Sequence, residues 1–93
     1  MRKYNFQDFR TVDAITNALF WYCDAITTPK GFRAQCPHRD CVKNKRRTLV
    51  CYTGGTVAHC YKCNRTYDAL SIVVMAERIS LFEACEKLQH FIG

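Results

Sequence analysis

Five of the seven cysteines in this 93-residue chain lie within 28 residues, from Cys36 to Cys63. A chain of this length buries only a small core, so a metal ion or disulfides would add substantially to its stability. The N-terminus, MRKYNFQDFR, is too polar for a signal peptide, and no apolar run is long enough for a membrane span. We therefore expect a cytoplasmic protein with no membrane association. In that reducing compartment, cysteines in this pattern indicate metal binding rather than disulfides.

The cysteine spacing predicts one structural Zn²⁺ ion held by four thiolates. Cys60 and Cys63 form a Cys-x-x-Cys turn, and Asn64 after them tolerates the left-handed backbone that such a turn often needs. Cys36 and Cys41 form a second pair upstream. Eighteen residues separate Cys41 from Cys60, which is enough for a hairpin to fold back and bring the two pairs together.

Three residues are candidates for the second ligand: Cys41, His38 and Cys51. His38 lies only two residues after Cys36, and two such close residues in an extended loop rarely converge on one ion. Cys51 would pair with Ala58 across the hairpin, on the same face as the Cys-x-x-Cys pair, but nearer the hairpin tip. Cys41 is the preferred ligand.

The other cysteines and histidines have simpler interpretations. His59 precedes Cys60 in a predicted strand and should point to the opposite face. Cys23 and Cys85 lie on apolar faces of predicted helices, where cysteine commonly serves as a small core residue.

Local signals predict a helix, a β-hairpin and two further helices. Thr11 can cap the first helix, Asp68 the second, and Ser80 with Glu83 forms a capping box for the third. The predicted helices span about 11–26, 68–78 and 80–92, with a turn at 27–31 and an extended lead at 32–35. The hairpin strands are 48–53 and 56–61, joined by Gly54 and Gly55, which should both have positive φ.

These elements predict a small α+β zinc-binding domain. It has a zinc-ribbon-like β-hairpin or small antiparallel sheet, one N-terminal helix and two C-terminal helices. We expect a single domain over residues 1–93, with the ribbon core at about 32–66.

The basic residues are concentrated where the cysteines are. The net charge is +6, yet residues 30–65 alone carry nine basic residues against one acid, Asp40. A solvated loop would also explain a charge run, but clustering around a metal site favours nucleic acid. The residues expected to contact phosphates are Lys43, Lys45, Arg46, Arg47, Lys62 and Arg65. Those expected to stack on unpaired bases are Tyr52 and Tyr61, with Tyr67 as a further candidate.

The stretch from Gly31 to Leu88 resembles the zinc-binding domain of DNA primases, the CHC2-type module of bacteria and phages. The first predicted helix is also placed as in that family, so the resemblance covers about residues 11–92. The residues in step with that pattern are Phe32, Cys36, Pro37, His59, Cys60, Cys63, Asp68, Met75, Glu77, Leu81, Phe82, Glu83, Ala84 and Leu88. The family commonly has histidine where Cys41 stands and glycine where Asn64 stands. The resemblance implies binding to a single-stranded DNA template and a role in starting or holding a primer during DNA replication.

The sequence contains no acidic cluster for two Mg²⁺ ions, no P-loop and no nucleophile–base pair. We therefore expect that the chain is not an enzyme by itself. As an accessory subunit it would act beside a separately encoded primase or DNA polymerase catalytic subunit, unless it is a fragment of a larger primase.

Three other functions remain alternatives. A protein–protein adaptor in a replication or transcription complex would bind no nucleic acid. A duplex-DNA-binding regulator would prefer double strands. A thiol oxidoreductase using Cys60 and Cys63 would lose zinc without losing its fold.

Overall fold

Helices and a sheet occupy separate parts of this chain. The computed structural model describes residues 6–39, 41 and 46–92. Its elements are a 3-10 helix η1 (Phe6–Phe9), α1 (Val12–Tyr22), β1 (Ile26–Thr28), β2 (Gly31–Ala34), β3 (Leu49–Tyr52), β4 (Ala58–Cys60), β5 (Arg65–Tyr67), α2 (Ala69–Glu77) and α3 (Leu81–Ile92). This confirms the predicted α+β fold with one helix before the sheet and two after it.

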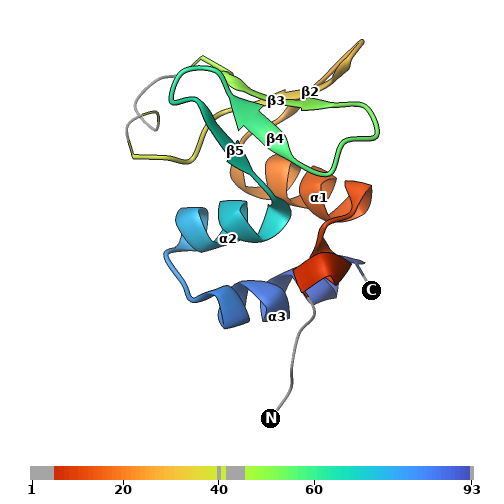
Figure 1. Ribbon diagram of the computed structural model, residues 1–93, viewed down its shortest axis with the longest axis vertical. Helices are drawn as coiled ribbons and strands as arrows, with labels where there is room; N and C mark the ends of the chain where they lie inside the picture. The colour runs from red at the N-terminus through yellow and green to blue at the C-terminus, as the bar shows by residue number, and fades with distance from the viewer. Residues whose placement is uncertain (1–5, 40, 42–45, 93) are drawn as a thin grey trace.

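The molecule has a sheet layer on one side and the helices on the other (Figure 1). The five strands follow the order β1-β2-β3-β4-β5, and each neighbouring pair is antiparallel. α1 and α2 lie beneath the sheet and contact each other, while α3 contacts both of them from the far side. The second face of the sheet is therefore left open, because no helix of the described residues covers it.

The predicted helix caps are confirmed. The Thr11 hydroxyl accepts a hydrogen bond from the Ala14 amide at 3.1 Å, and the Asp68 carboxylate accepts one from the Ser71 amide at 2.8 Å. The Ser80 hydroxyl accepts one from the Glu83 amide at 3.1 Å. Each cap satisfies an amide that has no partner within its helix.

The hairpin has the predicted register but not the predicted turn. Leu49 lies opposite Cys60, in the register predicted from the sequence. Gly54 has a φ of +79°, and the Gly55 amide donates to the Tyr52 carbonyl at 2.8 Å. Gly55 does not have positive φ, so the expectation for both glycines was wrong. The strands are joined by a longer loop over 53–57, which begins with a turn over 52–55. Only the third position of that turn requires a left-handed residue, and Gly54 occupies it.

Two short strands were not predicted. β1 occupies residues that were assigned to the end of a helix and a turn, and β5 follows the Cys-x-x-Cys turn. Each strand has three residues, too few to show an alternating pattern, and each is held by pairing with a neighbour. α1 ends at Tyr22 rather than near residue 26, because Asp24 takes a φ of 49° and redirects the chain into β1.

The core lies between the sheet and the helices. Its largest fully buried aliphatic side chains come from α1, α2, α3 and β3: Ile15, Leu19, Ile72, Val73, Leu88 and Leu49. Cys23 and Cys85 are buried in this core, as expected, and burial raises the pKa of Cys23 to about 12. Among the described residues, none of the helices combines the length and apolar character needed to cross a bilayer.

Candidate functional site

The structure brings four thiols together at one end of the sheet. Cys36 follows β2, Cys41 lies in the next loop, Cys60 ends β4, and Cys63 lies in the turn before β5. The Sγ atoms of Cys36 and Cys63 are 3.8 Å apart, and those of Cys41 and Cys60 are 3.9 Å apart. All four sulfurs lie within 4.8 Å of one another.

This geometry fits a metal ion. A tetrahedral site with Zn–S bonds of about 2.3 Å places its sulfurs about 3.8 Å apart. A disulfide would need about 2.05 Å, so the thiols are not bonded to each other. Three of the four cysteines are buried and Cys63 is half-buried, which leaves a closed site typical of a structural ion.

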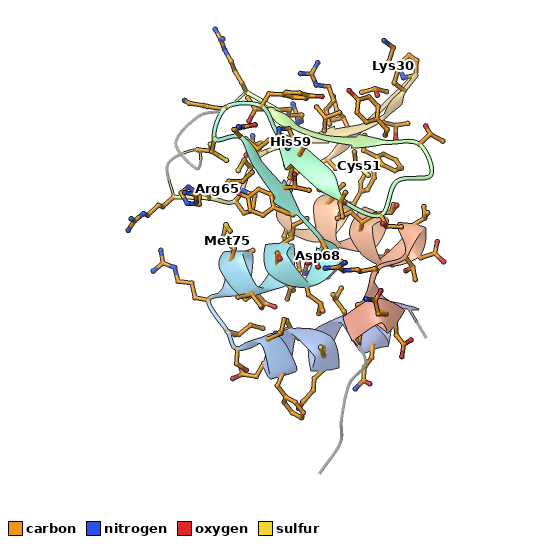
Figure 2. The ribbon with its side chains drawn as sticks, viewed as in Figure 1. Lys30, Cys51, His59, Arg65, Asp68 and Met75 are labelled. Carbon is orange, nitrogen blue, oxygen red and sulfur yellow. The ribbon has the colours of Figure 1, made fainter. Side chains whose placement is uncertain are left out.

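The two alternative ligands lie elsewhere. The Cys51 sulfur contacts the carbonyl oxygens of Tyr52 and Gly55 at 3.7 and 3.8 Å, near the hairpin turn. Figure 2 shows Cys51 between the strands and α1. The His38 ring nitrogen Nε2 contacts the Arg65 guanidinium instead of the sulfurs. Neither residue belongs to the group of converging ligand atoms.

The Cys-x-x-Cys turn has the backbone that its sequence predicts. Asn64 adopts a left-handed conformation with a φ of 56°. The Cys63 amide points back to the Cys60 sulfur at 3.5 Å, and the Thr48 hydroxyl lies 3.3 Å from the same sulfur. Hydrogen bonds of this kind hold a thiolate in place around a metal.

The thiols differ in how readily they lose their protons. Burial raises the pKa of Cys36 and of Cys41, because a thiolate is poorly solvated there. Burial also acts to raise the pKa of Cys60, but the Cys63 amide and the Thr48 hydroxyl outweigh it and lower that pKa to about 6. Four thiolates packed this closely require a cation to offset their charge.

The predicted phosphate-contacting residues do not all lie on one surface. Arg47 forms an ion pair with Asp24, with a nitrogen–oxygen distance of 2.9 Å, and its Nε also donates to the Asp24 carbonyl at 3.0 Å. Arg65 contacts His38. Lys43 and Lys45 lie outside the described residues.

Arg46 and Lys62 line a hollow of about 410 Å³ together with Thr48 and Tyr61. Tyr61 also borders a second hollow of about 470 Å³, whose other lining residues are Thr28, Pro29, Lys30, Arg33, Val50 and Tyr52. Figure 2 shows Lys30 at the tip of the β1–β2 hairpin. No acidic residue is among those that line the two hollows in the described part of the chain.

These hollows lie on the open face of the sheet, which we define by a row across all five strands. Paired residues in this row are Ile26, Arg33, Val50, His59 and Thr66. Tyr52 and Tyr61 belong to the same face, because each lies two residues beyond a member of the row. Arg33 is one of the nine basic residues of 30–65, but it was not among the residues expected to contact phosphates. An isolated arginine has no local signal, and only the strand pairing places it beside the tyrosines.

Tyr52 and Tyr61 form an exposed aromatic pair on the open face. The two residues are 56% and 60% exposed, and their hydroxyl oxygens lie 2.9 Å apart. The hydrogen bond to Tyr52 raises the pKa of Tyr61, and nearby Arg33 acts in the opposite direction. The His59 ring packs edge-on against Tyr61 with centroids 5.1 Å apart.

Tyr67 lies on the other side of the sheet and is buried. Its proposed stacking role was therefore wrong: a buried ring cannot meet a base. Its hydroxyl oxygen instead lies 3.6 Å from the Cys36 sulfur and 3.4 Å from the Cys63 sulfur.

Comparisons with protein-family models, with curated proteins and with solved structures found no match to this chain.

Proposed function

We propose that this protein is a zinc-stabilised module that binds single-stranded DNA on the open face of its sheet. It assists replication priming beside a separate primase or DNA polymerase catalytic subunit. The resemblance to primase zinc-binding domains supports the priming role, and the surface chemistry supports the ligand class.

The observation that carries the proposal is the Tyr52–Tyr61 pair. Large aromatic side chains on a strand surface usually pack against neighbouring elements, whereas these two are mostly exposed. Unpaired bases stack on aromatic rings without strong sequence preference, at about 1–3 kcal/mol per base. Duplex DNA buries its base faces, so two exposed rings favour a single strand.

Basic side chains stand on both sides of the aromatic pair. Arg33 and Lys30 border one hollow, and Arg46 and Lys62 border the other. A strand lying across the sheet can place its bases on the tyrosines and its phosphates near these cations.

The metal would have a structural role. Zn²⁺ suits four thiolates in a closed tetrahedral site, and Cys36, Cys41, Cys60 and Cys63 would hold it. It would join the loop after β2 to the end of β4, and so hold β3 and β4 in register below the tyrosines. Cysteines that bind a metal instead of pairing as disulfides fit a reducing compartment, which supports a cytoplasmic location. We propose no catalytic activity for the chain alone.

The test compares a labelled oligo(dT) single strand with a duplex of equal length by fluorescence anisotropy. Zinc-loaded protein should bind the single strand more tightly. Replacing Tyr52 and Tyr61 together with alanine should weaken binding at least about tenfold, since each stacked base contributes about 1–3 kcal/mol. Replacing both with phenylalanine keeps the rings and should restore most of the affinity.

Two outcomes would overturn this proposal. One is equal binding by the alanine and wild-type proteins. The other is tighter binding to the duplex, which would favour a regulator of double-stranded DNA.

A protein–protein adaptor is the second candidate, and α1 supplies its supporting observation. Phe20 and Trp21 are 45% and 67% exposed at the end of this helix. Exposed aromatic residues are common at protein interfaces. If no oligonucleotide binds at low salt, the adaptor becomes the leading account.

A further inference from the structure

Tyr67 reaches from the sheet into the cluster of sulfurs. It is the last residue of β5, and Asp68, the cap of α2, follows it directly. The residue is only 4% exposed. The phenol oxygen is 3.4 Å from the Cys63 sulfur and 3.6 Å from the Cys36 sulfur, so it touches one cysteine from each predicted ligand pair.

The buried hydroxyl of Tyr67 requires a hydrogen-bond acceptor, and the sulfurs are placed to supply it. A buried O–H group must find a hydrogen-bond acceptor, or it incurs a desolvation penalty. Among the described residues, the two sulfurs are its only hydrogen-bond partners. A thiolate is a better acceptor than a thiol because it carries a full charge.

We propose that Tyr67 is a positioning residue of the metal centre. Its single hydroxyl proton is shared between the thiolates of Cys36 and Cys63, or alternates between them. The hydrogen bond withdraws negative charge from sulfur and fixes both ligands relative to the end of β5. The thiolates consequently bind the metal in one arrangement and react more slowly with electrophiles.

The same contact joins the metal centre to the helix layer. Asp68 directly follows Tyr67 in the sequence. Its carboxylate accepts a hydrogen bond from the Ser71 amide at the start of α2. A displacement of the sulfurs would therefore also displace the first turn of α2. Thr48 contacts a third sulfur of the cluster in a similar way, with its hydroxyl 3.3 Å from the Cys60 sulfur.

This inference rests on the proposed metal site and is independent of DNA binding. The test uses Tyr67→Phe, which removes one oxygen and keeps the ring. Tyr22→Phe is the matched control, because it also removes a partly buried hydroxyl, one that donates to the Glu77 carboxylate at 2.6 Å. Both variants are compared with wild type after loading with Zn²⁺ or Co²⁺.

Three readouts are expected to change in Tyr67→Phe and not in the control. Zinc affinity, measured against a competing chelator, should fall about tenfold or more, as is typical when an outer-shell partner is lost. The thiolate-to-cobalt charge-transfer band should move to lower energy, because the sulfurs become more electron-rich. Zinc release by N-ethylmaleimide should become about fivefold faster, the factor expected for one net hydrogen bond.

A second measurement needs no variant. In wild-type protein loaded with ¹¹³Cd, the Tyr67 hydroxyl proton should exchange slowly with water and show scalar coupling to the metal through sulfur. Rapid exchange without coupling would overturn the proposal even if Tyr67→Phe failed to fold.

Other outcomes separate the possible failures. If Tyr67→Phe lowers thermal stability but leaves the cobalt band and the release rate at wild-type values, Tyr67 only fills space and the proposal is wrong. If wild-type protein takes up neither zinc nor cobalt, the metal site and this inference both fail. Loss of DNA binding alone would leave the inference unaffected.

Discussion

Cys41 and Cys60 lie 19 residues apart in the chain, yet their sulfur atoms are only 3.9 Å apart. The pairing of β3 with β4 sets the position of Cys60, which lies opposite Leu49. Cys51 lies two residues beyond Leu49 along the same strand, toward the hairpin turn. The group of four converging sulfurs therefore includes that of Cys41 and excludes that of Cys51.

Replacing Cys41 with serine should strongly reduce zinc binding, because it removes one of four ligands. We expect the loss to exceed the roughly 10- to 100-fold typical of an outer-shell change. Cys51→Ala is the control and should retain about one zinc per chain. Elemental analysis and chelator competition measure both. Full zinc affinity in Cys41→Ser would show that the second ligand is a different residue.

Removing the metal should unfold the ribbon over about residues 32–66. Metal binding contributes folding free energy on the order of 10 kcal/mol in zinc-finger peptides. The helices contact one another directly, so they should keep partial structure. Circular dichroism and amide exchange after strong chelation measure this. An unchanged exchange pattern in β3 and β4 would mean that the site is peripheral and would favour a redox role.

Replacing Gly31 with alanine should be severely destabilising. Gly31 has a φ of +142°, and a Cβ atom there would lie 2.1 Å from the Cys51 carbonyl oxygen in the neighbouring strand. Because that contact is with backbone, β2 and β3 would have to separate. We expect a loss of about 3 kcal/mol or more in the free energy of unfolding, at the upper end for single substitutions.

Gly54→Ala is the matched control for this prediction. Gly54 also has positive φ, at +79°, but nothing lies within 4 Å of the added Cβ. Only backbone strain of about 1–2 kcal/mol should result. Urea denaturation of the two variants should show the larger loss at Gly31. Equal losses would show that the close approach of β2 and β3 is not rigid.

Tyr22 should make stability depend on alkaline pH. Burial raises its pKa above the ordinary value of 10.0, and the hydrogen bond to Glu77 and the charge of that carboxylate act in the same direction. A group with a raised folded-state pKa stabilises the protein fully below its unfolded pKa. That stabilisation is lost as the pH rises above about 10, by about 1.4 kcal/mol per pH unit.

Comparison of wild type with Tyr22→Phe isolates this effect. At pH 8 the variant should be less stable by about 1.5 kcal/mol, the lower end for a hydrogen bond to a charged group. The difference should shrink toward zero between pH 10 and about 11. Urea denaturation at several pH values measures it. A constant difference across that range would mean that the hydroxyl does not titrate differently in the folded state.

Charge reversal on the open face should change the salt dependence of DNA binding. Four phosphate contacts predict a slope of roughly 3 in log affinity against log salt, since each contributes about 0.7 for single strands. Reversing Arg33 and Lys62 to glutamate should lower the slope by about 1.4 and keep the zinc content unchanged. Arg47 is a poor choice for this test, because its reversal also breaks the ion pair with Asp24.

Arg78→Glu serves as the matched charge control, because Arg78 is exposed at the end of α2 in the helix layer. It should leave the slope nearly unchanged. The same variants can then be mixed with a candidate catalytic partner, template and nucleotides. Primer formation should require both proteins and should fail only with the open-face variant. Equal priming without this chain would contradict the proposed role.

The sequence alone was sufficient for features decided within a few residues. The caps at Thr11, Asp68 and Ser80 were predictable because each side chain bonds an amide three residues away. The left-handed backbone of Asn64 was predictable because a Cys-x-x-Cys turn requires it locally. The pairing register of β3 and β4 was also predictable, because Gly54 and Gly55 mark the centre of the connection between them.

The tertiary structure decided which distant residues meet. β1 and β5 form only because neighbouring strands satisfy their backbone groups, so three-residue segments carry no signal of their own. Strand pairing places Arg33 on the same face as the tyrosines, and Arg47 forms an ion pair with Asp24. Tyr67 points into the core, where its hydroxyl contacts the sulfurs. Local hydrogen bonds depend on neighbours in the sequence, and so can be read from it. Contacts across the sheet depend on where separate segments pack, which is determined only when the whole chain folds.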